Sequence, residues 1–345
     1  MTAPLDPPPG LLVGLLARLA ASLLPLRGGL PRPEEIRRVL VVRTDDRVGN
    51  ALLTLPLVRA LQRALPFAQV DLLLAARRAQ VAEGLPGLTV LRFDKRDAFT
   101  HPLRFAKFLR GLRRQYEVVV DAAHWHAFSL TSALLSRWAA SRWLAGAQRG
   151  PAQIYSAAVP ADAALEDAAK LLLGGGLGLS LSPQPLETAL GRGPAPVGGR
   201  FAALNPGARK ADHLWPAARF AAVARGLLPL RSVVFWGPGE EALARAVVAD
   251  AQGAAELAPE TSLDQLAACF RAAALVVTND TGPMHLAVAC QAPVVALFLD
   301  EAGLRWAHPG PRFEAVVAAR DEAPVLAAAA RLLDSARTAA EPAPP

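Results

Sequence analysis

The stretch RVLVVRTDDRVGNALLTLPLVRALQRAL, residues 38–65, decides the fold that the sequence predicts. Its apolar run Val39-Leu40-Val41-Val42 predicts a buried strand. A polar loop, Arg43–Asn50, follows, and from Ala51 to Leu65 the apolar residues recur at helical spacing. A strand that passes through a short loop into a helix is the building unit of a parallel sheet with crossover helices.

The same alternation continues along the chain. Short apolar runs predict further strands at residues 70–74, 90–93, 118–121, 201–204, 232–236, 275–277 and 294–298. Segments with helical spacing lie at residues 101–115, 216–228, 240–251, 262–272 and 282–290. The sequence therefore predicts an α/β fold with two Rossmann-like, doubly wound domains that face a cleft, with ligands beyond the carboxyl ends of the strands.

The predicted division of the chain follows its composition. The stretch GRGPAPVGGR, residues 191–200, has the glycine and proline content of an interdomain linker. We expect an apolar N-terminal segment at residues 1–30, a first domain at residues 31–190, a second domain at residues 191–337 and a frayed tail at residues 338–345.

Residues 11–26 (LLVGLLARLAASLLPL) form the most apolar stretch. At about 1.5 Å per residue, this helix would be shorter than the roughly 30 Å core of a bilayer, and Pro25 closes the run. The stretch predicts either an interfacial helix that rests on a membrane or a helix that packs on the first domain. The N-terminus, MTAPLDPPPG, lacks the positive charges of a secretory signal.

Composition and charge exclude several classes of protein. With 345 residues, 52% hydrophobic and 19% charged, the chain is neither disordered nor a charged coiled coil. Its two cysteines, Cys269 and Cys290, exclude a disulfide framework. Residues 1–180 contain 23 Lys and Arg against 14 Asp and Glu, whereas residues 181–345 contain 14 against 16. The two halves should therefore have different partners, and no stacking-aromatic motif accompanies the arginines to indicate nucleic acid.

The loop Arg43–Asn50 is the first candidate site. Gly49 allows a close backbone approach, and the free N–H groups of the following helix favour an anion. Asp45 and Asp46 offer carboxylates for base chemistry. The glycine patterns of dinucleotide-binding and Walker A loops are absent, so the alternative is an ordinary strand–helix turn with solvated charges.

The loop Asn279–His285 also follows a strand and opens a helix. Thr281 supplies a hydroxyl, Gly282 lets a ligand approach, and Asp280 can accept hydrogen bonds from sugar hydroxyls. His285 lies about one turn into the helix, where it either donates to a phosphate or only packs. This loop therefore predicts an anion or sugar site.

Two further loops of the second half have the composition of a nucleotide site. The segment Asn205–Lys210, with His213 shortly after it, combines a glycine turn with cations that suit a pyrophosphate. Glu240 or Glu241 either pairs with ribose hydroxyls or only begins a helix. For both loops the alternative is an ordinary surface turn.

In the first half, His124 and His126 follow the strand end at Asp121 and are candidates for the acceptor side of the cleft. A metal site would need further ligands, which the sequence does not supply. The cations of residues 104–114 recur at helical spacing. They form either a phosphate- or membrane-facing stripe or a solvated helix face.

Together and in this order, the motifs resemble glycosyltransferase family nine, the bacterial heptosyltransferases of lipopolysaccharide core assembly. The resemblance runs from about Arg38 to Phe298, and its most specific piece is NDTGPMHLA, residues 279–287. It implies a GT-B fold, in which the second domain binds a nucleotide sugar and the first binds a lipid-linked acceptor. It also implies inverting, metal-independent chemistry, in which a base takes a proton from an acceptor hydroxyl.

Two positions depart from the family pattern. Asn50 stands where the family usually has the Asp that is expected as the base, and His213 stands where it usually has a Lys. Either Asp45 or Asp46 replaces the base, or the acceptor chemistry differs, or transfer activity has been lost. Arg209 or Lys210 would replace the missing cation.

With the resemblance, the sequence assigns three groups of site residues. The predicted catalytic residues are Asp46, Asp45 and Asn50. The predicted donor-binding residues are Asn205, Gly207, Arg209, Lys210, His213, Glu241, Asp280, Thr281, Gly282 and His285. The predicted acceptor-binding residues are Arg43, Arg47, Gly49, Asp121, His124 and His126, and no metal ligand is predicted.

The predicted function is inverting, metal-independent transfer of a heptose-like sugar from a nucleotide diphosphate sugar, such as ADP-heptose, to a lipopolysaccharide-core or related envelope glycan. No cofactor is expected besides this substrate. The expected partners are the nucleotide sugar, an anionic glycolipid and the inner-membrane surface, and the expected location is the cytoplasm of a Gram-negative bacterium, peripheral to that membrane. The alternatives are a non-catalytic sugar-nucleotide-binding homologue and, more distantly, a sugar-nucleotide epimerase.

Overall fold

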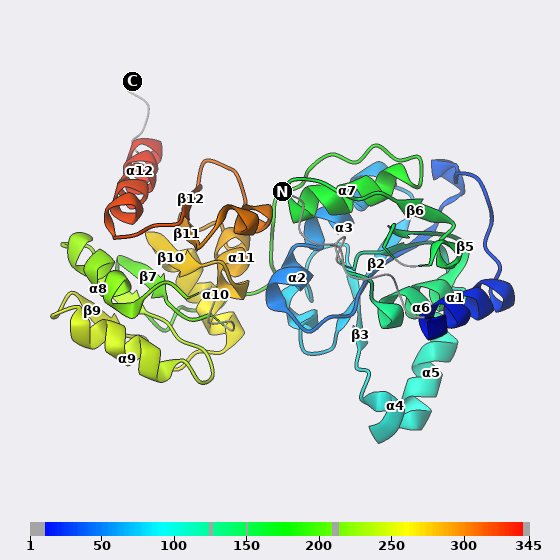
Figure 1. Cartoon of the computed structure of the whole chain (residues 1–345), viewed down its shortest axis with the longest axis horizontal. Coiled ribbons are helices and arrows are strands. Elements are labelled where there is room, and N and C mark those ends of the chain that lie inside the picture. Colours follow the sequence, from blue (N-terminus) through cyan, green and yellow to red (C-terminus); the bar gives the residue numbers. More distant parts are fainter. Residues whose placement is uncertain (1–10, 124–126, 150, 209–213, 341–345) are drawn as a thin grey trace. The chain divides into compact units, whose positions relative to one another are not determined.

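The computed structural model describes residues 11–123, 127–149, 151–208 and 214–340 (Figure 1). The chain divides into two compact units, residues 1–185 and 186–345. The division falls just before the Gly/Pro-rich stretch that begins at Gly191. Each unit contains one six-stranded parallel sheet with helices, as the α/β prediction requires.

The sheet of unit 1 has the strand order β3-β2-β1-β4-β5-β6. Its strands are β1 (Arg38–Arg43), β2 (Gln69–Ala75), β3 (Thr89–Phe93), β4 (Tyr116–Asp121), β5 (Ala140–Ala147) and β6 (Ala157–Val159). Its α-helices are α1 (Leu11–Leu23), α2 (Val48–Leu52), α3 (Leu55–Ala64), α4 (Asp97–Thr100), α5 (Pro102–Leu112), α6 (Leu130–Ala139) and α7 (Glu166–Gly175). The central strand β1 is buried from Val39 to Arg43, which explains its continuous apolar run.

The sheet of unit 2 repeats this order as β9-β8-β7-β10-β11-β12. Its strands are β7 (Phe201–Asn205), β8 (Arg231–Val234), β9 (Ala255–Leu257), β10 (Leu275–Asn279), β11 (Val294–Phe298) and β12 (Phe313–Val317). Its helices are α8 (Ala217–Gly226), α9 (Glu241–Asp250), α10 (Leu263–Ala272), α11 (Gly282–Ala289), α12 (Ala323–Ala340) and the 3₁₀ helix η5 (Glu301–Trp306).

Both sheets therefore have a topological switch point, where the chain direction across the sheet reverses. It lies between β1 and β4 in unit 1 and between β7 and β10 in unit 2. In open α/β sheets, ligands bind beyond the carboxyl ends of the strands at this point. Two of the loops that the sequence singles out, Arg43–Asn50 and Asn279–His285, follow β1 and β10.

The predicted single helix over residues 51–65 is wrong in one respect, because the segment forms α2 and α3 with a break at Leu53 and Thr54. Pro56 lies in the first turn of α3. A proline there has no N–H to donate, and its ring would clash with a carbonyl one turn earlier if the helix were continuous. The break leaves Asn50 in a short buried helix directly after the polar loop.

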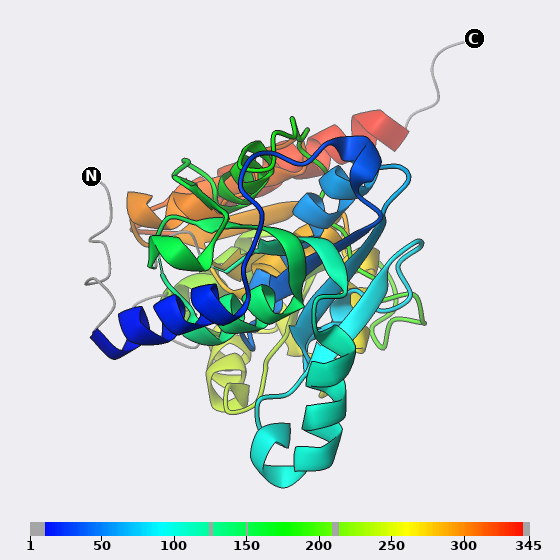
Figure 2. The same cartoon turned by 90° about the vertical axis from the view of Figure 1, so that its right-hand side faces the viewer.

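Helix α1 packs on unit 1 next to α6 (Figure 2). Ala17 and Leu24 are buried there, and the Arg137 guanidinium donates to the carbonyls of Ala21 and Leu24 at 3.2 and 2.9 Å. Among the described residues, none covers the opposite face of α1, which presents a row of leucines to solvent. Within the described part of the chain, no helix is both long and apolar enough to cross a membrane.

Candidate functional site

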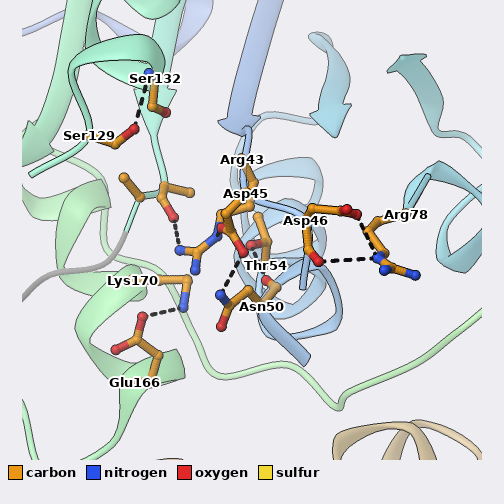
Figure 3. A network of polar contacts seen from close by, with 12 residues as sticks. Arg43, Asp45, Asp46, Asn50, Thr54, Arg78, Ser129, Ser132, Glu166 and Lys170 are labelled. Atoms are coloured by element: carbon orange, nitrogen blue, oxygen red, sulfur yellow. Dashed lines mark hydrogen bonds and ion pairs between the residues drawn. The ribbon is translucent and has the colours of Figure 1, made fainter. Parts of the chain in front are cut away.

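Arg43 occupies the switch point of unit 1. It is the last residue of β1, and its side chain is only 1% exposed. Its Nη1 donates to the carbonyl of Ala122, just beyond β4, at 2.6 Å. Its guanidinium also pairs with the Asp45 carboxylate. Asp45 Oδ1 accepts a hydrogen bond from Asn50 Nδ2 at 2.6 Å (Figure 3). Arg43, Asp45 and Asn50 thus form one network at the carboxyl end of the sheet.

The neighbouring carboxylate has a different environment. Asp46 pairs with Arg78 at 2.9 Å, and half of its side chain is exposed to solvent. Arg47 is exposed and precedes α2, while Gly49 is buried within α2. The fold therefore separates the two predicted base candidates, since Asp45 joins Asn50 and Asp46 points towards Arg78 (Figure 3).

A buried ion pair that sequence reasoning missed belongs to the same region. Lys170 Nζ donates to Glu166 Oε1 at 2.9 Å, and the two side chains are 2% and 1% exposed (Figure 3). Burial lowers the pKa of Lys170; the Glu166 charge opposes this shift, and the positive charge of Arg43 adds to it. The spacing of four residues on a helix is common to many surface pairs, so nothing in the sequence indicates that this pair is buried.

Asp121, a predicted acceptor-binding residue, lies at the end of β4 and is buried. It accepts hydrogen bonds from the Ser132 hydroxyl at 2.6 Å, the Tyr155 hydroxyl at 2.8 Å and the Ala123 N–H at 3.2 Å. Burial raises the pKa of Asp121, and these hydrogen bonds oppose the shift. Its oxygens therefore anchor β4 to α6 and to Tyr155. His124 and His126 lie outside the described residues.

In unit 2, Asn279 joins the two strands of the switch point. Its Nδ2 donates to the Pro206 carbonyl, beyond β7, at 2.8 Å, and its Oδ1 accepts from the Trp215 N–H at 3.3 Å. Thr281 precedes α11 in extended conformation, and Gly282 begins the helix. Thr281 Oγ1 donates to the Asn279 carbonyl at 3.3 Å rather than capping the helix. The loop after β7, which follows the buried Asn205, is thus held next to the end of β10.

The glutamates after β8 take different places. Glu241 pairs with Arg245 at 2.6 Å on α9. Glu240 Oε2 accepts from the Gly237 N–H at 3.0 Å, and a Cβ added to Gly207 would collide with the Glu240 carboxylate. The structure therefore brings Glu240 next to the loop after β7, whereas Glu241 faces Arg245. The cations Arg209, Lys210 and His213 of that loop lie outside the described residues.

His285 is buried, and its Nδ1 lies 2.7 Å from Nε2 of His308, which is also buried. One of these two nitrogens donates and the other accepts, so the contact fixes the tautomers of both rings relative to each other. His285 also packs edge-on against Trp306, with 6.5 Å between the ring centroids. His308 lies on a loop far along the chain, and no spacing in the sequence indicates it.

A cavity of about 260 Å³ opens next to Asp280, at the carboxyl ends of β10 and β11. Besides Asp280 its walls include Asp300, Gly303, Arg305 and Trp306, from the loop and 3₁₀ helix that follow β11. The sequence did not single out this segment. Among the described residues, no three His, Cys, Asp or Glu side chains gather as metal ligands.

Comparison with known proteins gives this arrangement its context. The model of glycosyltransferase family 9 (heptosyltransferase) matches residues 175–333. Among solved structures, E. coli heptosyltransferase WaaC with ADP is similar at 22% identity and a TM-score of 0.66, over 81% of this chain and 93% of that one. The family 9 glycosyl transferase of Veillonella parvula DSM 2008 is similar at 19% identity and a TM-score of 0.68, over 87% of this chain and 97% of that one. E. coli ADP-heptose LPS heptosyltransferase II is similar at 20% identity and a TM-score of 0.61, over 87% of this chain and 99% of that one.

At these identities the structural matches show a shared fold. A search of the curated proteins gave no match. The predicted fold class is confirmed: the chain has two six-stranded parallel sheets in an α/β fold similar to that of GT-B heptosyltransferases such as WaaC. The predicted resemblance to glycosyltransferase family 9, the heptosyltransferase family, is thus confirmed over residues 175–333, the part of the chain that the family model matches.

Proposed function

We propose that the protein is an inverting, metal-independent glycosyltransferase that moves a heptose-like sugar from an ADP-sugar to a lipopolysaccharide-core or related envelope glycan. The observation that carries the proposal is the family 9 domain, which includes the whole switch point of unit 2. Structures with a similar fold were solved with ADP and with ADP-2-deoxy-2-fluoro heptose. These ligands are the reason for choosing an adenine nucleotide.

In this proposal the donor diphosphate lies at the start of α11. Thr281 and Gly282 present the free N–H groups of the helix N-terminus, where an anion is favoured. The charge that develops on the leaving diphosphate is stabilised by these groups and by Arg209 or Lys210, which would replace the Lys that the family usually has where this chain has His213. Glu240, beside Gly207, is better placed for the ribose than Glu241, which pairs with Arg245.

We assign the general base to Asp45. Asn50 cannot take a proton near neutral pH, but its amide holds the Asp45 carboxylate at 2.6 Å, so the carboxylate lies beside the position where the family has its Asp. Asp45 would take the proton of the acceptor hydroxyl while that oxygen attacks the anomeric carbon. The bond from this carbon to the diphosphate breaks on the opposite face, so the configuration inverts and the nucleoside diphosphate leaves.

A nucleotide-sugar screen by thermal unfolding tests the donor assignment. A ligand at 100 times its Kd adds about 2.7 kcal/mol of stability. For a unit of this size that corresponds to a rise in Tm of roughly 5–11 °C. We expect this rise with ADP-heptose and no comparable rise with UDP-sugars. No shift with any nucleotide sugar would contradict the proposal.

Asn50 favours one alternative, a protein that binds the nucleotide sugar without transferring it. Turnover of the donor distinguishes the candidates. Transfer predicts release of nucleoside diphosphate only when a lipid acceptor is present. A binding protein releases none under either condition, and an epimerase converts the donor without an acceptor.

We also propose that the protein works at the inner-membrane surface, where its acceptor resides. Five leucines on the outer face of α1 are between 53% and 97% exposed, and they are Leu11, Leu12, Leu15, Leu19 and Leu23. A leucine face next to a basic unit suits the surface of an anionic membrane. The cations of α5, Arg104, Lys107 and Arg110, are exposed on the same unit.

Sedimentation with vesicles that contain anionic lipid tests this placement. Replacing Leu11, Leu15 and Leu19 with Gln leaves the buried Ala17 and Leu24 in place, so α1 should stay docked while vesicle binding is lost. Phe67→Gln, at a position that is 82% exposed elsewhere, serves as the control and should bind normally. Equal sedimentation of the triple variant and the control would refute the membrane proposal.

A further inference from the structure

The cavity next to Asp280 has walls that are held in place by contacts within unit 2. Asp300 precedes η5, and its Oδ1 accepts from the Gly303 N–H at 3.1 Å. Arg305 Nε donates to the Ala302 carbonyl at 2.9 Å. Trp306 meets the buried His285 edge-on, with an angle of 74° between the rings. These contacts fix a carboxylate, a guanidinium and an indole around one space.

Gly303 brings the two carboxylates of the cavity together. A Cβ added to Gly303 would lie 3.5 Å from Asp280 Oδ2 and 2.8 Å from Cδ1 of Phe298, a buried residue of β11. The backbone of η5 therefore approaches both β11 and the Asp280 side chain, and only glycine allows this approach. Because Gly303 also holds Asp300, the carboxylates of Asp280 and Asp300 line the same cavity.

The charges of the cavity indicate the kind of ligand it takes. Among the described residues of the wall, two carboxylates and one guanidinium leave a net negative charge. Such a wall repels a diphosphate, whereas carboxylates accept hydrogen bonds from several hydroxyls of a neutral ligand. An indole beside them offers an apolar face to the C–H groups of a sugar ring. The composition therefore favours a neutral polyhydroxylated ligand.

The volume of the cavity also favours a sugar-sized ligand. Pockets for drug-sized ligands range from about 300 to 1,000 Å³. A cavity of about 260 Å³ lies just below that range, so it suits one sugar ring better than a whole nucleotide sugar. Its position beyond β10, next to the start of α11, puts it beside the place proposed for the diphosphate.

We propose that Asp300, Arg305 and Trp306, which line this cavity beside Asp280, select which sugar of the donor is bound. This inference rests on the proposed function, and it adds residues that lie beyond the motif Asn279–His285. Asp300 and Arg305 bind hydroxyls of the ring, and Trp306 packs against its apolar face. Neither the nucleotide nor the diphosphate contacts these three residues.

The experiment compares the Kd of ADP with that of ADP-heptose by calorimetry, in the wild type and in Asp300→Asn and Trp306→Ala. Asn at residue 300 can still accept from the Gly303 N–H, so η5 should remain folded. The matched control is Asp321→Asn, because Asp321 Oδ1 accepts from the Ala323 N–H at 3.1 Å at the start of α12, on an exposed surface.

We expect the wild type to bind ADP-heptose more tightly than ADP. Loss of a hydrogen bond to a charged group should weaken ADP-heptose binding about 10-fold or more in Asp300→Asn, while the Kd of ADP changes less than about twofold. Trp306→Ala should have the same selective effect, and the control should have none. Equal weakening for both ligands, or no change in their ratio, would overturn the inference. A wild type that binds ADP but no nucleotide sugar would overturn the proposed function as well.

Discussion

The variants Asp45→Asn and Asp46→Asn should differ in stability and in activity, because the two carboxylates pair with arginines in different surroundings. Asp45 pairs with Arg43, which is 1% exposed, so the variant leaves a buried guanidinium without its carboxylate. Breaking a fully buried ion pair costs about 3–5 kcal/mol, and this is the upper limit here because the Asp45 side chain is 33% exposed. Asp46 pairs with Arg78 on the surface, where such a pair contributes about 0–1 kcal/mol.

These free energies convert into separate thermal and kinetic effects. For unit 1, this limit corresponds to a fall in Tm of at most roughly 20 °C in Asp45→Asn, and the Tm of Asp46→Asn should fall by no more than about 4 °C. If Asp45 is the base, its variant also loses about 10²–10⁴-fold in kcat, because general-base help has that magnitude. The Asp46 variant should retain nearly all of its kcat.

The assay is steady-state release of nucleoside diphosphate at saturating ADP-heptose and lipid acceptor, which gives kcat. It is measured well below the Tm of each variant, so that unfolding does not contribute. Circular dichroism under the same conditions checks that Asp45→Asn is folded. Wild-type kcat in a folded Asp45→Asn would refute the base assignment. Loss of activity in Asp46→Asn alone would instead transfer the role of base to Asp46.

Two more predictions concern buried polar pairs. Glu166→Gln should destabilise unit 1 by about 3–5 kcal/mol, since it leaves Lys170 buried next to Arg43 without its carboxylate. The pKa of Lys170 is lowered in the folded protein, so the unfolded chain binds more protons and the free energy of unfolding rises as the pH approaches 10.5, the ordinary pKa of a lysine. Chemical denaturation should therefore show that the difference in free energy of unfolding between wild type and Glu166→Gln shrinks from pH 7 to pH 10. A constant difference would contradict this. His308→Ala should lower the free energy of unfolding by about 1–3 kcal/mol, because His285 Nδ1 loses its buried hydrogen-bond partner. His308→Gln can still donate or accept a hydrogen bond, so it should lower the free energy of unfolding by less. An equal loss in both variants would mean that only the volume of the side chain matters.

The sequence predicts the central part of each sheet well. Strands β1, β10 and β11 and helix α10 are found within a residue or two of their predicted ends, because each has an uninterrupted apolar run or a clear start signal. Ser262 and Gln265 form a reciprocal capping box at the start of α10. Strand β5 was missed, since its sequence ASRWLAGA mixes Ser, Arg and Gly with apolar residues and is buried by its neighbours rather than by its own pattern.

The candidate site is predicted at the level of loops but not of side-chain partners. Spacing placed Arg43–Asn50 and Asn279–His285 after central strands, which is where the fold has them. Which of Asp45 and Asp46 faces Asn50 depends on side-chain directions within a polar loop, and neither periodicity nor composition determines them. The Asp300–Trp306 wall depends on a single 3₁₀ turn that follows β11, so only the structure brings it to Asp280.

The most direct test of the central claim is the mass of a lipid-linked core acceptor after incubation with the protein and ADP-heptose. Transfer predicts that the acceptor gains one heptosyl residue and that one ADP is released for each acceptor modified. Nuclear magnetic resonance of the product should then show an anomeric configuration opposite to that of the donor. An unmodified acceptor, under conditions where ADP-heptose demonstrably binds the protein, would contradict the account.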